Sequence, residues 1–325
     1  LSGRRHHYRI HRRTSRTVRL IEMDVLVVGS LAYDTLETPA GSSEDELGGS
    51  ASYGGFSAAF HNKKNHGNGI SILGVVGKDF KQEHLDWYED SGIDISGIEI
   101  VEGNTFRWIG SYHGNMAEAV THDTQLNVFE SFEPKIPQSH TNPKILMCAN
   151  LLPSIQSTVL DQVTPGGLTV LDSMNLWINI ALDELLEVIK RVEVLILNDG
   201  EVRMLSGEDN LMKASKKVLS MKNEGILIVK RGEHGVIAFH PDGIVSMPAY
   251  PTNNLVDPTG CGDTFAGALC QHLSKSEGTL SRDELIEALT HATVTASFTI
   301  EDFGANKLRN ITEEVLNSNQ KTVLL

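Results

Sequence analysis

Short apolar runs recur along the chain and are separated by segments of helical length. The run DVLVVGS at Asp24–Ser30 is rich in β-branched residues and ends in Gly-Ser, which is typical of a strand buried on both faces. Segments such as Leu182–Val192 and Leu211–Met221 have the length of helices. Further apolar runs lie at Ile70–Val76, Lys144–Ala149, Leu168–Leu171, Val194–Leu197 and Ile226–Val229. Because alternating strands and helices form right-handed βαβ crossovers, the pattern predicts a doubly wound α/β fold with a mainly parallel sheet flanked by helices.

Two regions depart from this rhythm, at about residues 35–47 and 96–129. Both alternate polar with apolar or aromatic residues, as in GIEIVEGNTFRWIGSYHG. Such alternation is typical of strands that are exposed on one face. Since both regions lie between βα units, we expect them to form a small antiparallel sheet over the strand ends, where ligands bind in open α/β folds. This sheet is called the lid below.

Composition and charge exclude several classes of protein. The chain has 325 residues, 40% of them hydrophobic, and its most apolar run, Met23–Leu31, is far shorter than the roughly 18 residues of a membrane helix. The formal net charge of -14 disfavours a nucleic-acid partner. The three cysteines, Cys148, Cys261 and Cys270, have no metal-ligand spacing and indicate a reducing compartment, so we expect a cytoplasmic protein.

Residues 1–22 form a basic leader that differs from the rest of the chain. They contain seven arginines and a single acid, Glu22. A basic, acid-poor leader can be an organelle transit peptide or can bind nucleic acid. We favour a third interpretation, non-native or disordered flanking sequence, because Met23 stands directly before the first strand and the leader lacks the apolar face of a transit peptide. The predicted domain therefore spans residues 23–325.

The segment DPTGCGDTFAGAL, at Asp257–Leu269, carries the most chemical information. Its proline and two glycines predict a tight turn into a helix, so the backbone N–H groups of Gly260, Cys261, Gly262 and Asp263 would point outward at a helix N-terminus and bind a phosphate. A carboxylate at this position repels an anion, and it is better explained as a base that takes a proton from an attacking hydroxyl. An isolated Gly-x-Gly-Asp could instead be an ordinary helix start whose acid stabilises the helix dipole.

Three further motifs accompany this segment. They are LGGSASYGG at Leu47–Gly55, NDGEVRMLSG at Asn198–Gly207 and KRGEHG at Lys230–Gly235. With DPTGCGDTFAGAL they occur in the order of the ribokinase-like, or PfkB, family of carbohydrate and nucleoside kinases, which the chain resembles from Met23 to about Leu308. The resemblance implies a ribokinase-like fold and a kinase that uses ATP and Mg²⁺, with a monovalent cation as a further candidate cofactor. It also suggests a homodimer formed through the lid.

The resemblance assigns roles on the phosphate side of the site. Asp263 would be the catalytic base, with Gly260, Cys261 and Gly262 as backbone donors to the transferred phosphate. Asn198 and Glu201 would meet magnesium through its water shell, which that ion largely keeps. Taken alone, Glu201 could be an ordinary acid at a helix N-terminus, and KRGEHG a common hairpin turn. The residues expected to bind the nucleotide or its metal are Asn198, Glu201, Lys230, Gly232, Gly235, Thr259 and Thr293.

The resemblance also assigns the acceptor side. Asp34 would grip hydroxyl groups, because each carboxylate oxygen can accept a hydrogen bond, and Phe106, Arg107 and Trp108 lie in the predicted lid. Polar residues at strand ends can equally be loop caps. The candidates for contact with the acceptor are Asp34, Gly48, Gly49, Tyr53, Phe106, Asn150, Asp172 and Asn175.

Two residues depart from the family pattern. Tyr53 stands where asparagine usually follows the glycine pair, which leaves room for a nucleoside base or another polyol, and Cys261 stands where alanine is usual. The chain contains neither a Walker A sequence nor GxGxxG after the first strand, which disfavours a P-loop NTPase and a dinucleotide dehydrogenase. The sequence predicts a kinase of a small sugar of the ribose or ketohexose type. The alternatives are a nucleoside kinase, a vitamin kinase of the same superfamily and a non-catalytic binding protein.

Overall fold

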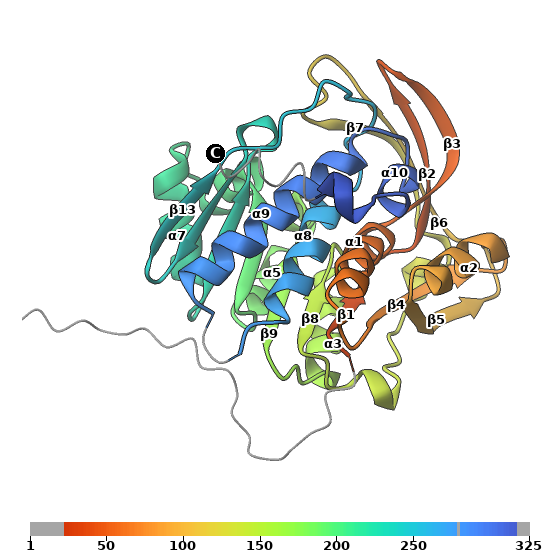
Figure 1. Cartoon of the computed structure of the whole chain (residues 1–325), viewed down its shortest axis with the longest axis horizontal. Coiled ribbons are helices and arrows are strands. Elements are labelled where there is room, and N and C mark those ends of the chain that lie inside the picture. Colours follow the sequence, from red (N-terminus) through yellow and green to blue (C-terminus); the bar gives the residue numbers. More distant parts are fainter. Residues whose placement is uncertain (1–22, 278–279, 317–325) are drawn as a thin grey trace, which may run out of the picture.

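A nine-stranded sheet runs through the centre of the molecule (Figure 1). The computed structural model describes residues 23–277 and 280–316, so the predicted leader lies outside the described residues. The strand order is β13-β12-β11-β10-β9-β8-β1-β4-β5. All neighbours from β11 to β5 are parallel, and β12 and β13 add an antiparallel hairpin at one edge. The structure thus confirms the predicted doubly wound, mainly parallel sheet.

The six predicted strands are all present and almost completely buried. The strands of this sheet are β1 (Val25–Val28), β4 (Ile70–Gly77), β5 (Ile93–Val101), β8 (Ile145–Cys148), β9 (Leu168–Asp172), β10 (Val194–Asn198), β11 (Ile226–Lys230), β12 (Val236–His240) and β13 (Gly243–Met247). Their apolar residues alternate between two cores. Val25 and Val27 of β1 belong to one core, and Leu26 and Val28 belong to the other. This is why the strand reads as a continuous apolar run.

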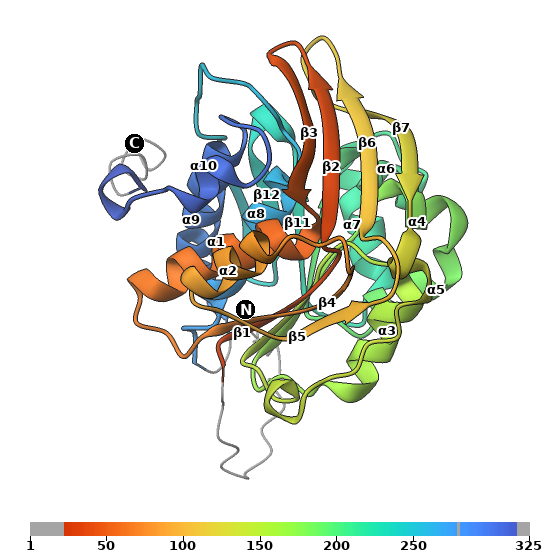
Figure 2. The same cartoon turned by 90° about the vertical axis from the view of Figure 1, so that its right-hand side faces the viewer.

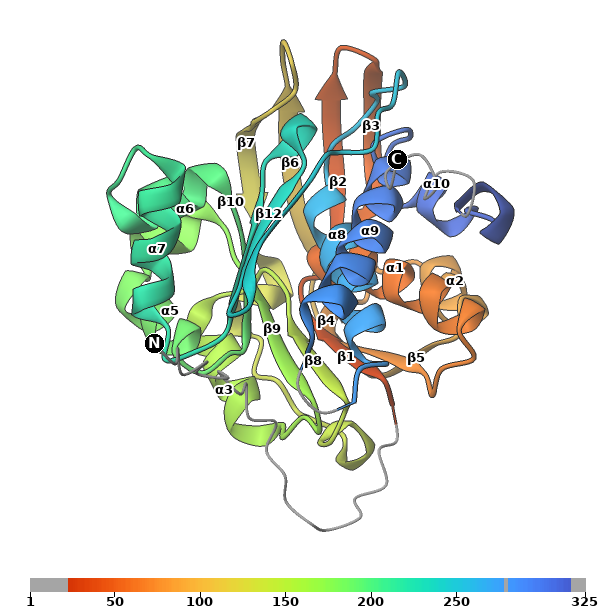
Figure 3. The same cartoon turned by 60° about the vertical axis from the view of Figure 1, so that its left-hand side comes forward.

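Helices cover both faces of this sheet (Figure 3). The first core lies under α1, α2, α8 and α9, and the second lies under α3, α5, α6 and α7. Among the described residues, no helix is long and apolar enough to cross a membrane. The helices are α1 (Ser50–Lys64), α2 (Gln82–Asp90), α3 (Pro153–Gln162), α4 (Asn175–Ile180), α5 (Leu182–Ile189), α6 (Asp199–Ser206), α7 (Leu211–Met221), α8 (Cys261–Leu273), α9 (Arg282–Thr299) and α10 (Asn306–Arg309).

A second sheet stands over one end of the strands and forms the lid (Figure 2). Its order is β3-β2-β6-β7, with β2 at Ala32–Thr38, β3 at Gly41–Gly48, β6 at Phe106–Tyr112 and β7 at Ala119–Gln125. The predicted lid is confirmed with two corrections. Strands β2 and β6 pair in parallel, so the sheet is mixed, and β5, expected to be part of the lid, is the edge strand of the main sheet. An edge strand with one exposed face alternates in the same way as a lid strand.

Helices α1 and α8 touch backbone to backbone. A Cβ atom added at Gly267 would lie 2.1 Å from the carbonyl oxygen of Gly54. The Ser57 hydroxyl donates to the Thr264 carbonyl oxygen at 2.7 Å, which adds a polar contact across the same pair of helices. Only glycine at position 267 allows this approach. The N-termini of the two helices therefore lie close together.

Candidate active site

Three neighbouring parallel strands of the main sheet end in polar residues. Asp172 is the last residue of β9, Asn198 of β10 and Lys230 of β11. Because parallel strands present their carboxyl ends at one edge, this brings residues from distant parts of the sequence together. The N-terminus of α8 lies beside them, since a Cβ atom on Gly262 would be 2.8 Å from Lys230 Nζ. These elements form the candidate active site.

The turn before α8 is fixed by Asp257, which is 1% exposed. One carboxylate oxygen accepts from the Thr259 N–H at 2.8 Å, and the other accepts from the Gly304 N–H at 3.3 Å. Gly260 precedes the helix with φ 73°, the left-handed conformation that glycine adopts without strain. The Cys261 N–H donates to Pro258 O at 3.2 Å, so this predicted phosphate donor is used within the turn. Gly262 and Asp263 lie in the first helical turn, whose N–H groups have no carbonyl partner in the helix.

The ring of Tyr53 packs directly on this turn. A Cβ atom added at Gly260 would lie 2.4 Å from the ring, so position 260 requires glycine for two independent reasons. The Tyr53 hydroxyl is buried and has no hydrogen-bond partner among the described residues. Burial raises the pKa of Tyr53 well above its usual value, and nearby Asp34, Asp257, Cys261 and Asp263 raise it further. The aromatic residue that departs from the family pattern therefore lies between Asp34 and the turn at Asp257–Gly260, which is called the phosphate turn below because the sequence predicts phosphate binding there.

Carboxylates converge on this tyrosine. Burial raises the pKa of Asp34 to about 8, and Asp257 and Asp263 add to the shift. Burial and Asp172 raise the pKa of Asp263 to about 7, against the lowering effect of Lys230. A Cβ atom on Gly48 would lie 1.9 Å from Asp34 Oδ2, so the missing side chain of Gly48 leaves room for that carboxylate. Repulsion among these acids favours protonated forms or bound hydrogen-bond donors.

Lys230 is the cation of the site. Its Nζ lies 3.0 and 2.9 Å from the two carboxylate oxygens of Asp172. Burial lowers the pKa of Lys230, but the carboxylates of Asp172, Glu201 and Asp263 outweigh burial and raise it. The ammonium group is therefore charged and lies at the start of α8. Asp172, which we expected on the acceptor side, forms the ion pair with this lysine.

Asn198 and Glu201 hold each other at the start of α6. Asn198 Oδ1 accepts from the Glu201 N–H at 2.8 Å, and Glu201 Oε2 accepts from the Asn198 N–H at 2.7 Å. This capping box explains the helix start. Burial raises the pKa of Glu201 to about 7, and Lys230 opposes the shift. The second carboxylate oxygen can still accept from a metal-bound water, so these oxygen donors fit Mg²⁺.

The other residues predicted to bind the nucleotide are spread around β12, β13 and the lid. Gly235 and Thr293 both adjoin Met247: a Cβ on Gly235 would lie 2.0 Å from its carbonyl oxygen, and Thr293 Oγ1 lies 3.9 Å from its sulfur. Gly232 is exposed in a turn with φ 53°. The Thr259 hydroxyl bonds to the hydroxyl of Tyr112 at 3.3 Å and so connects the phosphate turn to the lid.

Several residues predicted to contact the acceptor have structural partners. Asn150 Oδ1 accepts from Trp177 Nε1 at 2.8 Å and holds α4, whose first residue, Asn175, is exposed. Phe106 stacks on Phe129 with ring centroids 5.5 Å apart. Gly49 has φ 92°, and a Cβ there would lie 2.4 Å from Ser30 O, so the backbone itself requires glycine.

The two other aromatic or charged lid residues lie on opposite faces of the lid. Trp108 is opposite Asp34 in the pairing of β6 with β2, is partly exposed, and packs against the lid cluster of Leu36, Tyr112 and Met116. Arg107 is adjacent in sequence, and its guanidinium pairs with Asp79 at 3.1 Å and also with Asp45. Trp108 therefore lies on the same face of the lid as Asp34. Arg107 lies on the other face and connects the lid to Asp79 through its ion pair.

Sequence reasoning missed two residues of the site and one contact. These residues are Asp257, which the motif alone marks only as its first position, and Tyr112, and both contact Thr259. An acid directly before Pro258 in the phosphate turn is the signal that marks Asp257. No sequence signal indicated that Asp172 and Lys230, which are 58 residues apart, form an ion pair.

Comparison of the sequence with models of protein families identifies the family of this chain. Residues 23–311 match the model of the pfkB family carbohydrate kinases. The chain belongs to this family. It is a phosphotransferase with an alcohol acceptor. The charged and polar residues at the strand ends are of the kind that phosphoryl transfer requires.

Individual relatives include nucleoside and sugar kinases. The cytidine kinase of Thermococcus kodakarensis is 29% identical over 260 residues, covering 78% of this chain and 89% of the relative. The nucleoside kinase of Methanocaldococcus jannaschii superposes with a TM-score of 0.73 at 18% identity, covering 93% of this chain and 99% of that one. A ribokinase of Cryptococcus neoformans, solved in complex with ADP, gives a TM-score of 0.73 at 22% identity over 92% of this chain and 99% of that one. These likenesses confirm the ribokinase-like fold.

Proposed function

We propose that the protein is an ATP-dependent nucleoside kinase that transfers the γ-phosphoryl group to a hydroxyl of the nucleoside's ribose. The observation that carries the kinase reaction is the position of Asp263, at the N-terminus of α8 and beside Lys230. The nucleoside replaces the simple sugar that we expected from the sequence. The similarity to a cytidine kinase over 78% of the chain supports this change.

The acceptor side also favours a nucleoside. Trp108 pairs in register with Asp34, so an aromatic face lies beside a carboxylate on the inner side of the lid. A nucleobase can stack on an indole ring while the carboxylate accepts from ribose hydroxyls. The unpaired Tyr53 hydroxyl provides another group for the ligand, at the position where an amide would read a sugar. A simple sugar lacks the flat aromatic face that a nucleobase offers to the indole ring of Trp108.

The side chains suit an in-line transfer. Asp263 takes the proton of the acceptor hydroxyl, whose oxygen forms the new P–O bond while the bond between the γ-phosphorus and the β-phosphate oxygen breaks and ADP leaves. A pKa of about 7 makes Asp263 an effective base near neutral pH. The Lys230 ammonium and the first-turn amides of α8 stabilise the negative charge on the transferred group. The similarity to an ADP-bound ribokinase fold supports ATP as donor.

Magnesium fits the oxygen donors at the start of α6. Asn198 and Glu201 would hold its hydrated form, and the ion would neutralise phosphate charge when bound. This chain's own residues supply the remaining functions: Asp34 orients the acceptor, and the lid excludes water from the reacting groups.

The test measures ADP release with Mg²⁺ and ATP for cytidine, uridine, adenosine, inosine, ribose, fructose and myo-inositol. We expect the highest kcat/KM for a nucleoside. Asp263→Asn should lower kcat by about 10²- to 10⁴-fold, whereas Asp209→Asn, an exposed control, should leave it unchanged. Full activity of Asp263→Asn would refute the assigned base.

Two other outcomes separate the alternatives. A higher kcat/KM for a free sugar than for any nucleoside would overturn the substrate while leaving the kinase assignment intact. Binding of nucleoside and ATP by calorimetry, without ADP release above background, would instead indicate a non-catalytic binding protein.

A further inference from the structure

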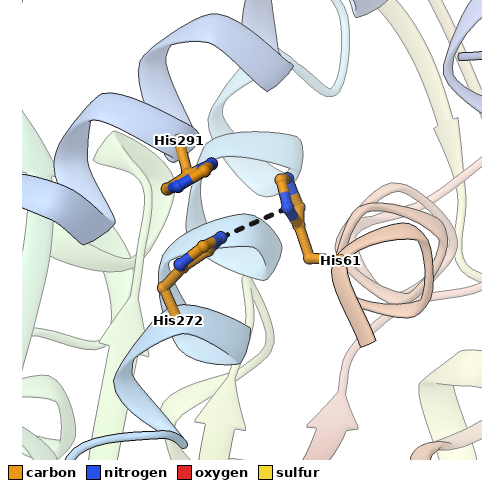
Figure 4. Close-up of side chains that lie close together, drawn as sticks. All are labelled: His61, His272 and His291. Carbon is orange, nitrogen blue, oxygen red and sulfur yellow. Dashed lines mark hydrogen bonds between the residues drawn. The ribbon is translucent and has the colours of Figure 1, made fainter. Parts of the chain in front are cut away.

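Three histidines from three helices meet in the interior of the helical layer (Figure 4). His61 lies on α1, His272 on α8 and His291 on α9, and one nitrogen of each ring lies within 4.8 Å of the others. His61 and His272 are buried, and His291 is half-buried. Within residues 23–277 and 280–316, this is the one group of three or more histidine, cysteine or acidic side chains close enough to share an ion.

We propose that this histidine cluster binds a first-row transition-metal ion, and that Zn²⁺ fits it best. The donors are imidazole nitrogens, which suit Zn²⁺, Cu²⁺ and Ni²⁺, whereas Mg²⁺ and Ca²⁺ prefer oxygen. His61 Nδ1 and His272 Nε2 are 3.2 Å apart. Two nitrogens bound to tetrahedral zinc at about 2.0–2.1 Å are separated by about 3.3 Å, so this pair already has the required spacing.

The hydrogen bonds around His61 prepare it as a ligand. The Thr295 hydroxyl donates its single proton to the His291 carbonyl oxygen at 2.7 Å. It must therefore accept from His61 Nε2–H, which lies 2.8 Å away. The lone pair of His61 is consequently on Nδ1, which faces His272. In metal sites, the second nitrogen of a histidine ligand commonly donates to a partner of this kind, which fixes the ring.

The other two rings need only local changes. His272 and His291 are stacked, with centroids 3.7 Å apart and an angle of 14° between their planes, so they must tilt apart to direct their nitrogens at one ion. Binding through His272 Nε2 moves its proton to Nδ1, where Lys275 Nζ lies 3.4 Å away. Lys275 is exposed and can move into solvent. His291 is the half-buried member, so its side offers the entry path and a position for a water as fourth ligand.

Charged side chains of both signs lie near the cluster. Lys64 of α1 and Lys275, just after α8, are the nearby cations, and Glu287 of α9 and Asp24 lie near Lys275. Burial lowers the pKa of all three histidines, that of His291 to about 4, and the lysines lower it further. The rings are therefore neutral at pH 7 and can coordinate without losing a proton.

The ion would stabilise the fold and take no part in phosphoryl transfer. Asp263 and His272 are nine residues apart on α8, which separates them by about 14 Å along the helix axis. The cluster joins α1, α8 and α9 at the end remote from the phosphate turn. The proposal therefore does not depend on the identity of the acceptor.

The test uses the full chain, stripped with chelator and titrated with ZnCl₂ alone by calorimetry. His6, His7 and His11 in residues 1–22 are a second source of imidazole, so a parent protein with glutamine at these three positions removes that background. We expect this parent to bind one Zn²⁺ per chain and its melting temperature to rise by about 5 °C at saturating Zn²⁺. In that parent, His291→Gln should weaken binding at least tenfold, whereas His234→Gln, in an exposed turn, should not.

A second measurement keeps the test decisive if His291→Gln does not fold. Co²⁺ bound to the parent should give the intense visible absorption of a tetrahedral site, and Zn²⁺ should abolish it. The proposal is overturned if the parent binds no Zn²⁺, if His291→Gln binds it as tightly as the parent, or if Mg²⁺ raises the melting temperature equally. Each of these results would leave a hydrogen-bonded histidine core without a metal function.

Discussion

Replacement of Asp34 by asparagine should stabilise the free protein at neutral pH while impairing its function. Asp34 is 4% exposed, and its pKa is raised from 3.8 to about 8 by burial and by Asp257 and Asp263. The folded protein therefore holds a proton that the unfolded chain releases above pH 3.8. The stability that this proton contributes is fully present below that pH and is lost as the pH rises towards 8.

The magnitude follows from the pKa shift. Between pH 5 and 7 each pH unit costs about 1.4 kcal/mol for one such group, so Asp34 should lower the free energy of unfolding by about 2.7 kcal/mol over this range. Asparagine has nearly the shape of the protonated carboxyl group and does not titrate. The advantage of Asp34→Asn over the parent should thus grow by about this amount from pH 5 to pH 7.

Urea unfolding of both proteins at pH 5, 6 and 7, without ligands, measures this difference. Glu201 also has a raised pKa, but it contributes in both proteins, so subtraction removes it and leaves Asp34 together with its interaction with Asp257 and Asp263. Asp209→Asn, at an exposed position, should run parallel to the parent and serves as the control. Parallel curves for Asp34→Asn and the parent would refute the reasoning, because they would mean that Asp34 is ionised in the free protein.

The remaining predictions concern the phosphate side of the site. The kcat/KM should rise about tenfold per pH unit below pH 7 and level off above it as Asp263 loses its proton, and a flat profile between pH 5.5 and 8 would contradict its role as base. Gly260→Ala should cost about 1–3 kcal/mol more in urea unfolding than Gly207→Ala, because both residues have positive φ but only the new methyl group at 260 meets the Tyr53 ring. Equal losses would mean that the ring moves aside freely. Lys230→Met should lower the free energy of unfolding at pH 7 by about 3–5 kcal/mol, since it leaves the Asp172 carboxylate buried and unpaired, and adding Asp172→Leu should recover part of the loss. No recovery in the double variant would contradict this explanation.

The sequence predicted the central strands well because burial on both faces requires continuous apolar runs. The sequence was less informative where the same alternation of polar and apolar residues is compatible with two different positions of a strand. The polar and apolar alternation of Ile98–Val101 suits an edge strand of the main sheet and a lid strand equally, so β5 was assigned to the lid. The parallel pairing of β2 with β6 was also out of reach, because alternation does not record the direction of a neighbouring strand.

In the candidate site, features set by neighbouring residues could be predicted from the sequence, and contacts set by the packing of distant elements could not. Local motifs predicted the tight turn before α8 and the start of α6 at Asn198 and Glu201, because their geometry depends on residues a few positions apart. Asp172 was recognised as a strand-end acid, but its partner depends on the strand order that brings β9 and β11 to either side of β10. The histidine cluster depends on how three helices pack. Nothing in the spacing of positions 61, 272 and 291 predicts it.

The glycine contact between α1 and α8 limits how this enzyme can move. With Gly267 against the carbonyl of Gly54, the two helices have no side-chain layer in which to slide past each other. Tyr53 on α1 and the turn before α8 should therefore keep a fixed separation through the catalytic cycle. Closure around a substrate must then come from the lid, whose hydroxyl contact between Tyr112 and Thr259 can open and re-form. Changes to the lid should alter substrate choice and the rate of product release. The alignment of the reacting groups should instead depend on the packing of α1 against α8.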